Sequence, residues 1–136
     1  MTELPDYNAR IAAEFRANAG RVGGSFEGRS LLLLHTIGAR SGAPRLSPLA
    51  YVTVDGRMLI IGSYAGAPKD PAWVHNLRAH PRARIEVGTD TRDVTARELR
   101  GAERAAVYPK VVAAADHLAE HQARTTRVIP IFELTH

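Results

Sequence analysis

The sequence of 136 residues contains no cysteine, which excludes a disulfide framework, a thiolate nucleophile and any metal site with cysteine ligands. No apolar run approaches the ~20 residues that a membrane-spanning helix needs. Tryptophan occurs once and lysine twice, so arginine carries nearly all of the positive charge. The remaining composition, 45% hydrophobic and 24% charged, is ordinary for a globular protein, and we expect one domain over residues 1–136.

The net charge of +4 favours an anionic ligand without naming one. The basic residues are spread along the chain without interleaved strand aromatics, so no nucleic-acid partner is expected. The first six residues, Met1 to Asp6, lack the basic and then apolar order of a signal peptide, which makes the cytoplasm the expected location.

An amphipathic helix is predicted near the N-terminus, because Tyr7, Ile11 and Phe15 recur with helical spacing. The favoured interpretation is that this helix packs on its own domain. The alternative is peripheral contact with an anionic membrane surface, since arginines flank the apolar stripe. The glycine-rich segment 20–24 ends the helix, so residues 1–24 are expected to be helix and linker and residues 25–136 the main fold.

Six short strands are predicted in the rest of the chain, with helices between some of them. The expected strands are 30–37, 46–54, 57–61, 84–87, 94–99 and 128–134, the last with Pro130 at an edge or bulge position. Asp55-Gly56 and the segment 88–91 are hairpin turns. One helix is expected to begin with Asp70 as N-cap and to end at His80. A second helical region is expected from about 102 to 122, with an interruption near Pro109. The fold class is α+β, mainly β: an antiparallel sheet of about six strands curled into a small barrel with flanking helices.

The loop from Gly38 to Arg45 lies between the first two predicted strands and carries two arginines, a serine and two glycines. Glycine allows close approach of backbone N–H groups, and arginine presents a fork of donors to phosphate or carboxylate. This composition favours an anion site, and the alternative is a basic hairpin loop in water. A phosphate-binding P-loop is excluded, because no Gly-Lys-Ser/Thr follows.

A second segment, residues 63–76, leaves a buried strand and enters a helix whose first turn has free N–H groups. Trp73 and Asn76 lie three residues apart on nearly one helix face, so a ring and an amide are placed to address one ligand. The alternative is that Trp73 fills the core.

The histidines carry no clear catalytic pattern. His117 to His121 match the His-x-x-Glu-His zinc motif, but Glu133 is the one acid downstream of them, and we expect no metal site. His35 lies inside an apolar strand and is expected to be a satisfied core histidine. No Gly-x-Ser-x-Gly elbow supports a hydrolytic triad.

Taken together, residues 31–49 (LLLLHTIGARSGAPRLSPL) resemble the opening signature of the deazaflavin-dependent nitroreductase family, the split β-barrel reductases that use coenzyme F420. Segments of the middle block and the closing stretch 126–131 also fit the family. The resemblance runs from about residue 29 to the C-terminus. It implies a split barrel that binds a flavin-like ring with a phosphate and a polyglutamate tail.

The resemblance also implies roles for particular residues. Arg40 and Arg45 would bind the phosphate or the tail carboxylates, and Ser41 and Gly42 would shape their loop. The expected ring-binding residues are Pro48, Ser63, Ala72, Trp73 and Asn76, and the expected proton donors are Ser63, Tyr64 and Tyr108.

Three departures from the family pattern are present. Many members have a basic residue at the position of Ala39 and lysine at that of Tyr64, so binding is expected to be weaker or to favour another tail length. The relatives that activate nitroimidazoles carry tyrosine at the position of Ala50, so that activity is not expected here.

The resemblance implies a cytoplasmic reductase that transfers a hydride from reduced deazaflavin to a small electrophilic acceptor, such as a quinone, a nitro compound or an activated alkene. The alternatives are a protein that binds or sequesters coenzyme F420 without turnover, and a split barrel that binds FMN or haem. The acceptor and the oligomeric state are not determined by the sequence.

Overall fold

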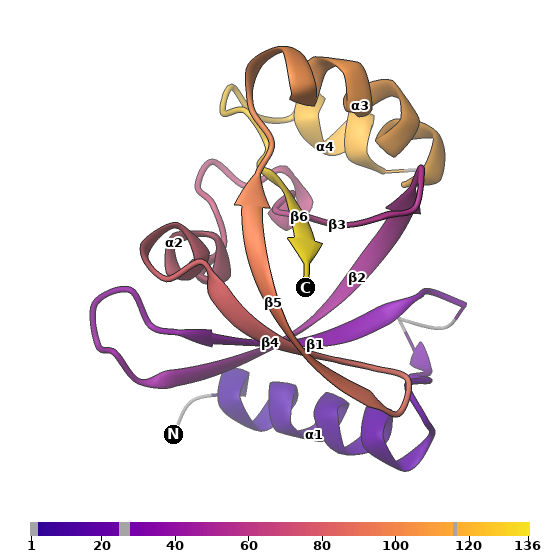
Figure 1. The fold of residues 1–136 in the computed structure, drawn as a ribbon, viewed down its shortest axis with the longest axis vertical. Helices are drawn as coiled ribbons and strands as arrows, with labels where there is room; N and C mark the ends of the chain where they lie inside the picture. Colours follow the sequence, from indigo (N-terminus) through magenta and orange to yellow (C-terminus); the bar gives the residue numbers. More distant parts are fainter. Residues whose placement is uncertain (1–2, 25–27, 116) are drawn as a thin grey trace.

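A computed structural model describes residues 3–24, 28–115 and 117–136, and the expected boundary at residue 25 adjoins residues outside this part. Its strands form a closed antiparallel barrel in the order β1-β2-β3-β6-β5-β4, flanked by helices (Figure 1). The strands are β1 (Leu31–Ile37), β2 (Pro44–Val54), β3 (Arg57–Ile61), β4 (Arg82–Val87), β5 (Asp90–Glu98) and β6 (Ile131–Thr135). The split-barrel architecture predicted from the sequence is therefore confirmed.

Two tight hairpins connect neighbouring strands. Asp55 and Gly56 both have positive φ, 53° and 75°, and join β2 to β3 as the Asp-Gly signal predicts. The turn between β4 and β5 holds only residues 88 and 89, because β5 already begins at Asp90. The expected loop over 88–91 was thus too long by two residues.

The last strand closes the barrel, since β6 pairs with both β3 and β5. The strand begins at Ile131, so Pro130 precedes it and needs no ladder N–H of its own. The Pro130 carbonyl instead accepts a hydrogen bond from the Gly62 amide at 2.9 Å. The predicted edge position was wrong, because the strand has neighbours on both sides.

The apolar run in β1 is buried on both faces of the sheet, as expected. Leu32 and Leu34 belong to the cluster inside the barrel, while Leu31 and Leu33 belong to the cluster under the N-terminal helix. The helix α2 (Ala72–Ala79) contributes Trp73 and Leu77 to the interior cluster, so it covers one end of the barrel.

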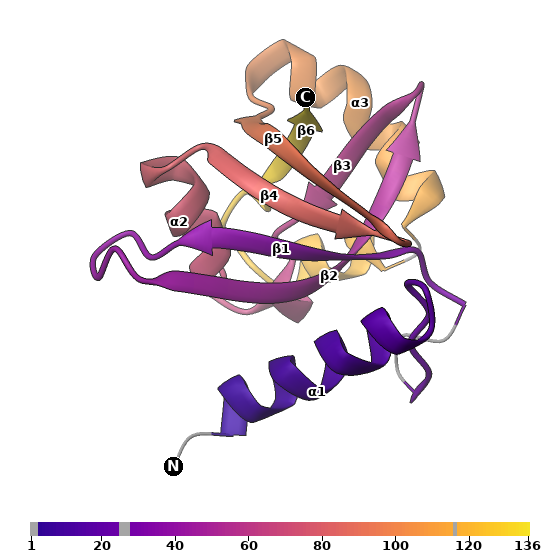
Figure 2. The ribbon, with the colours of Figure 1, turned by 60° about the horizontal axis from the view of Figure 1, so that its bottom comes forward.

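The N-terminal helix α1 (Glu3–Ala17) lies along the outside of β1 and β2 (Figure 2). Phe15 is 1% exposed, which agrees with packing on the protein's own barrel. Arg16 pairs with Glu86 of β4 at 2.6 Å, and His35 Nε2 lies 2.7 Å from the same carboxylate. His35 is thus satisfied, as predicted, but its side chain is 35% exposed, so its predicted place in the core was wrong.

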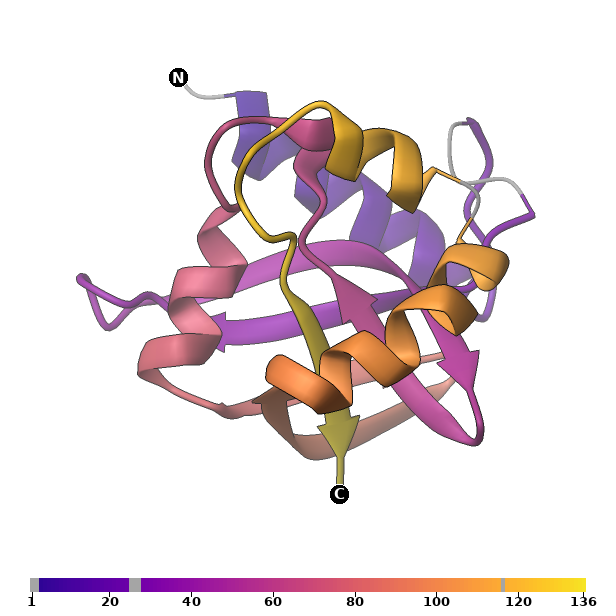
Figure 3. The same cartoon turned by 90° about the horizontal axis from the view of Figure 1, so that it is seen from above.

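The C-terminal helices α3 (Gly101–Ala114) and α4 (Leu118–Ala123) cover the other side of the barrel (Figure 3). Pro109 lies inside α3 without ending it, so the predicted interruption there was wrong. Val107 and Val111 of α3 are buried against the barrel, and this packing offsets the backbone bond that proline removes. The break comes instead after Ala115, whose backbone is extended. Among the described residues, no helix has the length and apolarity to cross a membrane.

Candidate functional site

A cavity of about 820 Å³ opens between β2, the segment from β3 to α2, and the region where α3 ends and α4 begins. It forms because β2 changes partner: residues 44–50 pair with β1, whereas residues 51–54 pair with β3. The chain after β3 diverges from the first half of β2 and leaves a gap. The walls are residues 28–30, 48–53, Ile61, Ser63, Tyr64, Pro71, Trp73, Ala114, Ala115, His117, Leu118 and His121. This size is typical of a site for a small organic ligand.

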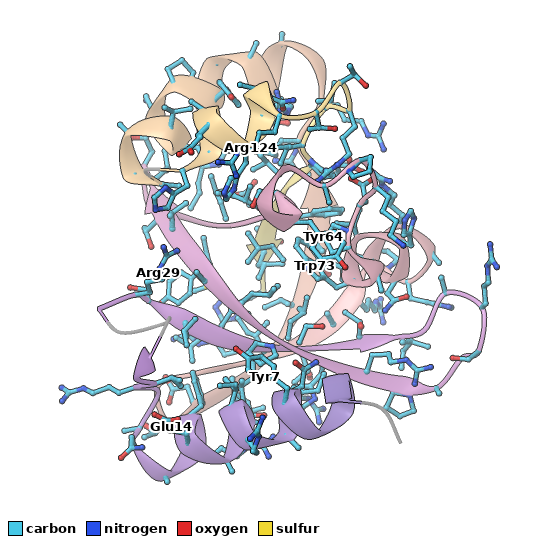
Figure 4. The ribbon with its side chains drawn as sticks, turned by 180° about the vertical axis from the view of Figure 1, so that it is seen from behind. Tyr7, Glu14, Arg29, Tyr64, Trp73 and Arg124 are labelled. Atoms are coloured by element: carbon cyan, nitrogen blue, oxygen red, sulfur yellow. The ribbon has the colours of Figure 1, made fainter. Side chains whose placement is uncertain are left out.

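The segment between β3 and α2 forms one wall of the cavity. It contains Ser63 and the short 3-10 helix η2 (Tyr64–Gly66), and Tyr64 has a φ of 47°, which a tyrosine rarely adopts. The Tyr64 side chain is 53% exposed, so its hydroxyl is accessible beside Trp73 (Figure 4). Two of the three predicted proton donors, Ser63 and Tyr64, therefore lie in the same wall of the cavity.

Arg127 holds this segment in place, a role that sequence analysis did not assign. Its guanidinium donates to the carbonyls of Gly62, Ser63 and Ala67 at 3.0, 2.6 and 2.7 Å. It also pairs with Asp70 at 2.7 Å, and both side chains are largely buried. A planar group with five donors suits several carbonyls at once. The motif Thr126-Arg127 was part of the family resemblance, but only the fold reveals this function.

Asp70 does not cap α2, so the predicted N-cap was wrong. The residue at that position is Pro71, with an extended backbone and no side-chain cap. The Asp70 carboxylate is already taken up by Arg127 and by Arg78, the latter at 3.1 Å. Arg78 in turn pairs with Glu98 of β5 at 2.8 Å, so this network ties α2 to the barrel.

Trp73 contributes to both the core and the cavity. It is 6% exposed, packs edge-on against Phe132 at 5.8 Å, and still lines the cavity opposite Pro48. The two interpretations of this tryptophan are therefore compatible. Ala72 is exposed at the start of α2 and does not line the cavity itself.

The β1–β2 loop is compact and basic. The Gly38 amide donates to the Ala43 carbonyl at 2.8 Å, and Gly42, with a φ of 70°, donates to Gly38 at 2.9 Å. Ser41 Oγ accepts from the Ala43 amide and from Arg45. Within the described residues, no carboxylate pairs with Arg40 or Arg45, whereas most other arginines have such a partner.

Asn76 anchors this loop and does not line the cavity. The side chain is 6% exposed, accepts from the Ala39 amide at 2.9 Å, and donates to Thr36 Oγ1 at 3.2 Å. One N–H and one oxygen lone pair of its amide are left without a partner among these bonds. In the structure Asn76 positions the β1–β2 loop, and its contact with the ring stays a prediction.

Tyr108 lies outside the cavity, contrary to its expected role as proton donor. It is half-buried on α3, and the guanidinium carbon of Arg104 lies over its ring, 4.9 Å from the ring centroid. Its side chain packs with the cluster between α3 and the barrel. The helix face that carries Val107 and Val111 also carries Tyr108, so its helical position directs it to that cluster.

Of the residues that line the cavity, only Pro48, Ser63, Tyr64 and Trp73 were predicted, and the basic side chains of Arg29, His117 and His121 are among those that sequence analysis missed. The rings of His117 and His121 stack with centroids 6.0 Å apart and an angle of 25°. Burial lowers the pKa of His121, and the nearby charges of Arg124, His117 and Arg29 lower it further, opposed by Glu120. The spacing of the two histidines was visible in the sequence but was weighed only as a zinc motif.

The family model described as F420H(2)-dependent quinone reductase matches residues 8–136. The F420H(2)-dependent quinone reductase Rv1261c of Mycobacterium tuberculosis is 36% identical over 127 residues, which cover 90% of this chain and 85% of the relative. A second protein of that organism, named putative F420H(2)-dependent quinone reductase Rv3178, is 33% identical and aligns with 76% of this chain and 87% of its own length.

Two solved structures are similar to this chain in both sequence and fold. An F420-H2 dependent reductase, FDR-A, is 38% identical with a TM-score of 0.68, covering 78% of this chain and 94% of its own. A structure described as a domain-swapped dimer is 35% identical with a TM-score of 0.70, over 96% and 98% of the two chains. The haem storage protein HutZ of Vibrio cholerae, at 17% identity, shares the fold alone. This chain belongs to the F420H(2)-dependent quinone reductase family.

Proposed function

We propose that this protein is an F420H2-dependent oxidoreductase that reduces a small electrophilic acceptor, with a quinone as the first choice. Membership of the family and the names of the relatives support the cofactor and the reaction. The observation that carries the proposal is the cavity together with the basic β1–β2 loop, whose Arg45 lies three residues along β2 from the cavity residue Pro48.

The cavity and the loop are connected through two elements. Along β2, Arg45 lies three residues from Pro48, which lines the cavity. Along α2, Trp73 lines the cavity and Asn76, one turn later, bonds the loop at Ala39. A ligand with an apolar planar end and an anionic end therefore fits this arrangement, and coenzyme F420 has both.

When bound, reduced coenzyme F420 supplies the hydride, and the protein needs to bind, orient and shield the reactants. Trp73 and Pro48 offer apolar walls that exclude water from the ring site. Arg40 and Arg45 offer the positive charge for a phosphate or carboxylate. Ser63 and Tyr64 place hydroxyl groups in the cavity wall, whereas Tyr108 packs with the cluster between α3 and the barrel, outside the cavity.

The proposal is tested by fluorescence titration of the purified protein with coenzyme F420, with FMN alongside, followed by assay of the reduced cofactor with a panel of quinones. We expect binding of F420, not of FMN, and oxidation of the reduced cofactor by at least one quinone. Binding without oxidation by any acceptor would identify a sequestering protein. Binding of FMN or haem alone would contradict the proposal.

The placement of the anionic end is tested by Arg40→Ala and Arg45→Ala. Loss of one charge-assisted contact is expected to weaken F420 binding about tenfold in each variant. Arg92→Ala is the matched control, because it removes the same charge from β5, which does not line the cavity. Equal F420 affinities in all three variants would mean that the anionic end of the cofactor does not bind at the β1–β2 loop.

A further inference from the structure

Two histidines in the cavity wall are not used by the proposed function. His117 and His121 lie one turn apart at α4 and both line the cavity, on a different wall from Trp73 and Pro48. His121 is half-buried, whereas the side chain of His117 is 57% exposed. Both imidazoles therefore border the cavity, and that of His117 is the more exposed to solvent.

The position of His121 is fixed by its backbone surroundings. Its amide donates to the His117 carbonyl at 2.9 Å, and its own carbonyl lies against Gly66 of η2 so closely that a Cβ there would stand 2.7 Å away. The next residue, Gln122, donates to the Arg127 carbonyl and accepts from the Ile129 amide. The imidazole is thus held on a helix that is fastened to the same loop that carries Ser63 and Tyr64.

The charges around His121 come from two segments. At α4, the flanking residues His117 and Arg124 are basic and Glu120 within the helix is acidic, with Arg124 paired to Glu120 at 2.7 Å. From the segment before β1, the cavity residue Arg29 adds a second guanidinium, and both Arg29 and Arg124 are labelled in Figure 4. The tyrosines of the cavity wall are Tyr51 and Tyr64. Burial and these charges lower the pKa of His121, so its imidazolium is a stronger acid than that of an ordinary histidine and is populated at lower pH.

We propose that His121 is the proton donor to the acceptor, and that His117 connects it to solvent. The proposal rests on the proposed function. A quinone that gains a hydride becomes a hydroquinone monoanion, and one proton from the His121 imidazolium completes the hydroquinone. Oxidation of the cofactor releases one proton to solvent, and His121 regains one proton from solvent on the exposed side where His117 lies, so that atoms and charge balance.

The first test needs no cofactor. Ring signals of the histidines are followed by NMR while 2-methyl-1,4-naphthoquinone is added to the protein, with His121→Gln used for assignment. We expect the His121 signals to shift and those of His75, which is exposed on α2 outside the cavity wall, to stay in place. Saturable quinone binding that leaves the His121 signals unchanged would overturn the proposal, and so would the absence of quinone binding up to the solubility limit.

The second test uses the pH dependence of turnover with reduced F420 and the same quinone. A general acid contributes at least ~100-fold, so His121→Gln should lower kcat by about that factor, leave F420 affinity within twofold, and abolish the decline of kcat at high pH. His117→Gln should move this decline to higher pH, because the charge that lowers the pKa of His121 is gone. His75→Gln should match the parent protein. An unchanged pH profile in His121→Gln and in His117→Gln would overturn the proposal.

Failure of the proposed function has a separate signature. If the parent protein binds no F420 in the fluorescence titration, the cofactor assignment fails, while the NMR test of His121 with the quinone still gives its own answer. If F420 binds and is oxidised, but the variants behave as the parent, only the assignment of His121 is wrong.

Discussion

At the scale of single residues, the cavity wall depends on one arginine. Arg127 makes three bonds to carbonyls and one ion pair, and its side chain is 13% exposed. Lysine keeps the charge but has no planar fork, so Arg127→Lys leaves buried carbonyls without donors. We expect a loss of about 3 kcal/mol in the free energy of unfolding, measured by chemical denaturation.

The control for this change is Arg124→Lys, at the residue that follows α4. The Arg124 pair with Glu120 is more than half exposed on both sides, so the expected change is under about 0.5 kcal/mol. A loss below about 1 kcal/mol in Arg127→Lys would mean that the segment from Gly62 to Asp70 is held mainly by other contacts.

Glu86 gives a pH dependence of stability with a defined sign. The hydrogen bond from Arg16 lowers its pKa from 4.5 to about 2, although burial opposes the shift. Since the folded protein binds this proton less readily than the unfolded chain, the stabilisation is present above about pH 5 and is lost as pH falls toward about 2. Glu86→Gln should therefore cost about 2 kcal/mol at neutral pH, and this difference should shrink as pH falls from about 5 and disappear below about pH 2.

This prediction is checked by denaturation of both proteins across that pH range. Asp93→Asn serves as the control, because the pair between Asp93 and Arg84 is largely exposed and should contribute little at any pH. A constant difference between the parent and Glu86→Gln from pH 7 to pH 2 would contradict the assignment.

At the scale of elements, the contact between η2 and α4 shapes the cavity. Gly66 has a φ of 79°, and an added Cβ would meet the His121 carbonyl at 2.7 Å and the Arg124 Cβ at 2.9 Å. Gly66→Ala should therefore lower the free energy of unfolding by about 3 kcal/mol, from the strained backbone and the overpacking together.

Gly56→Ala isolates the backbone part of this effect. Gly56 has nearly the same φ, 75°, but no heavy atom lies within 4 Å of its added Cβ. Its cost should be about 1–2 kcal/mol, measured by the same denaturation. Equal losses in the two variants would show that α4 moves away from η2 without cost.

The elements also show which parts of the site the sequence could predict. Local signals located the β1–β2 loop, the turn at Asp55-Gly56 and the start of α2, because glycine and proline act on their own neighbourhood. The N-cap at Asp70 was wrong, and Asn76 and Tyr108 lie outside the cavity. Asp70 and Asn76 bond residues 57 and 37 positions away, and Tyr108 packs against the barrel, and the sequence does not state which faces meet. The continuation of α3 through Pro109 likewise depended on burial against strands distant in sequence.

At the scale of the whole molecule, the hairpin-rich order of the chain was enough to predict a barrel. The pairings that close it, β1 with β4 and β6 with both β3 and β5, link segments far apart in the sequence and were not predicted individually. The cavity itself follows from the change of partner along β2, a property of the closed barrel that no local pattern records.

The arrangement of α1 on the barrel gives the last prediction. Phe15 fills the space over Leu31 and Leu33, whereas Tyr7 on the same helix is 38% exposed. Because Phe15 is part of the core, Phe15→Ala should cost about 3–5 kcal/mol, and Tyr7→Ala, the control, less than about 1 kcal/mol. Both are measured by denaturation in the absence of lipid. If α1 served mainly to contact a membrane, Phe15→Ala would leave the stability in solution unchanged, and vesicle binding rather than folding would depend on this residue.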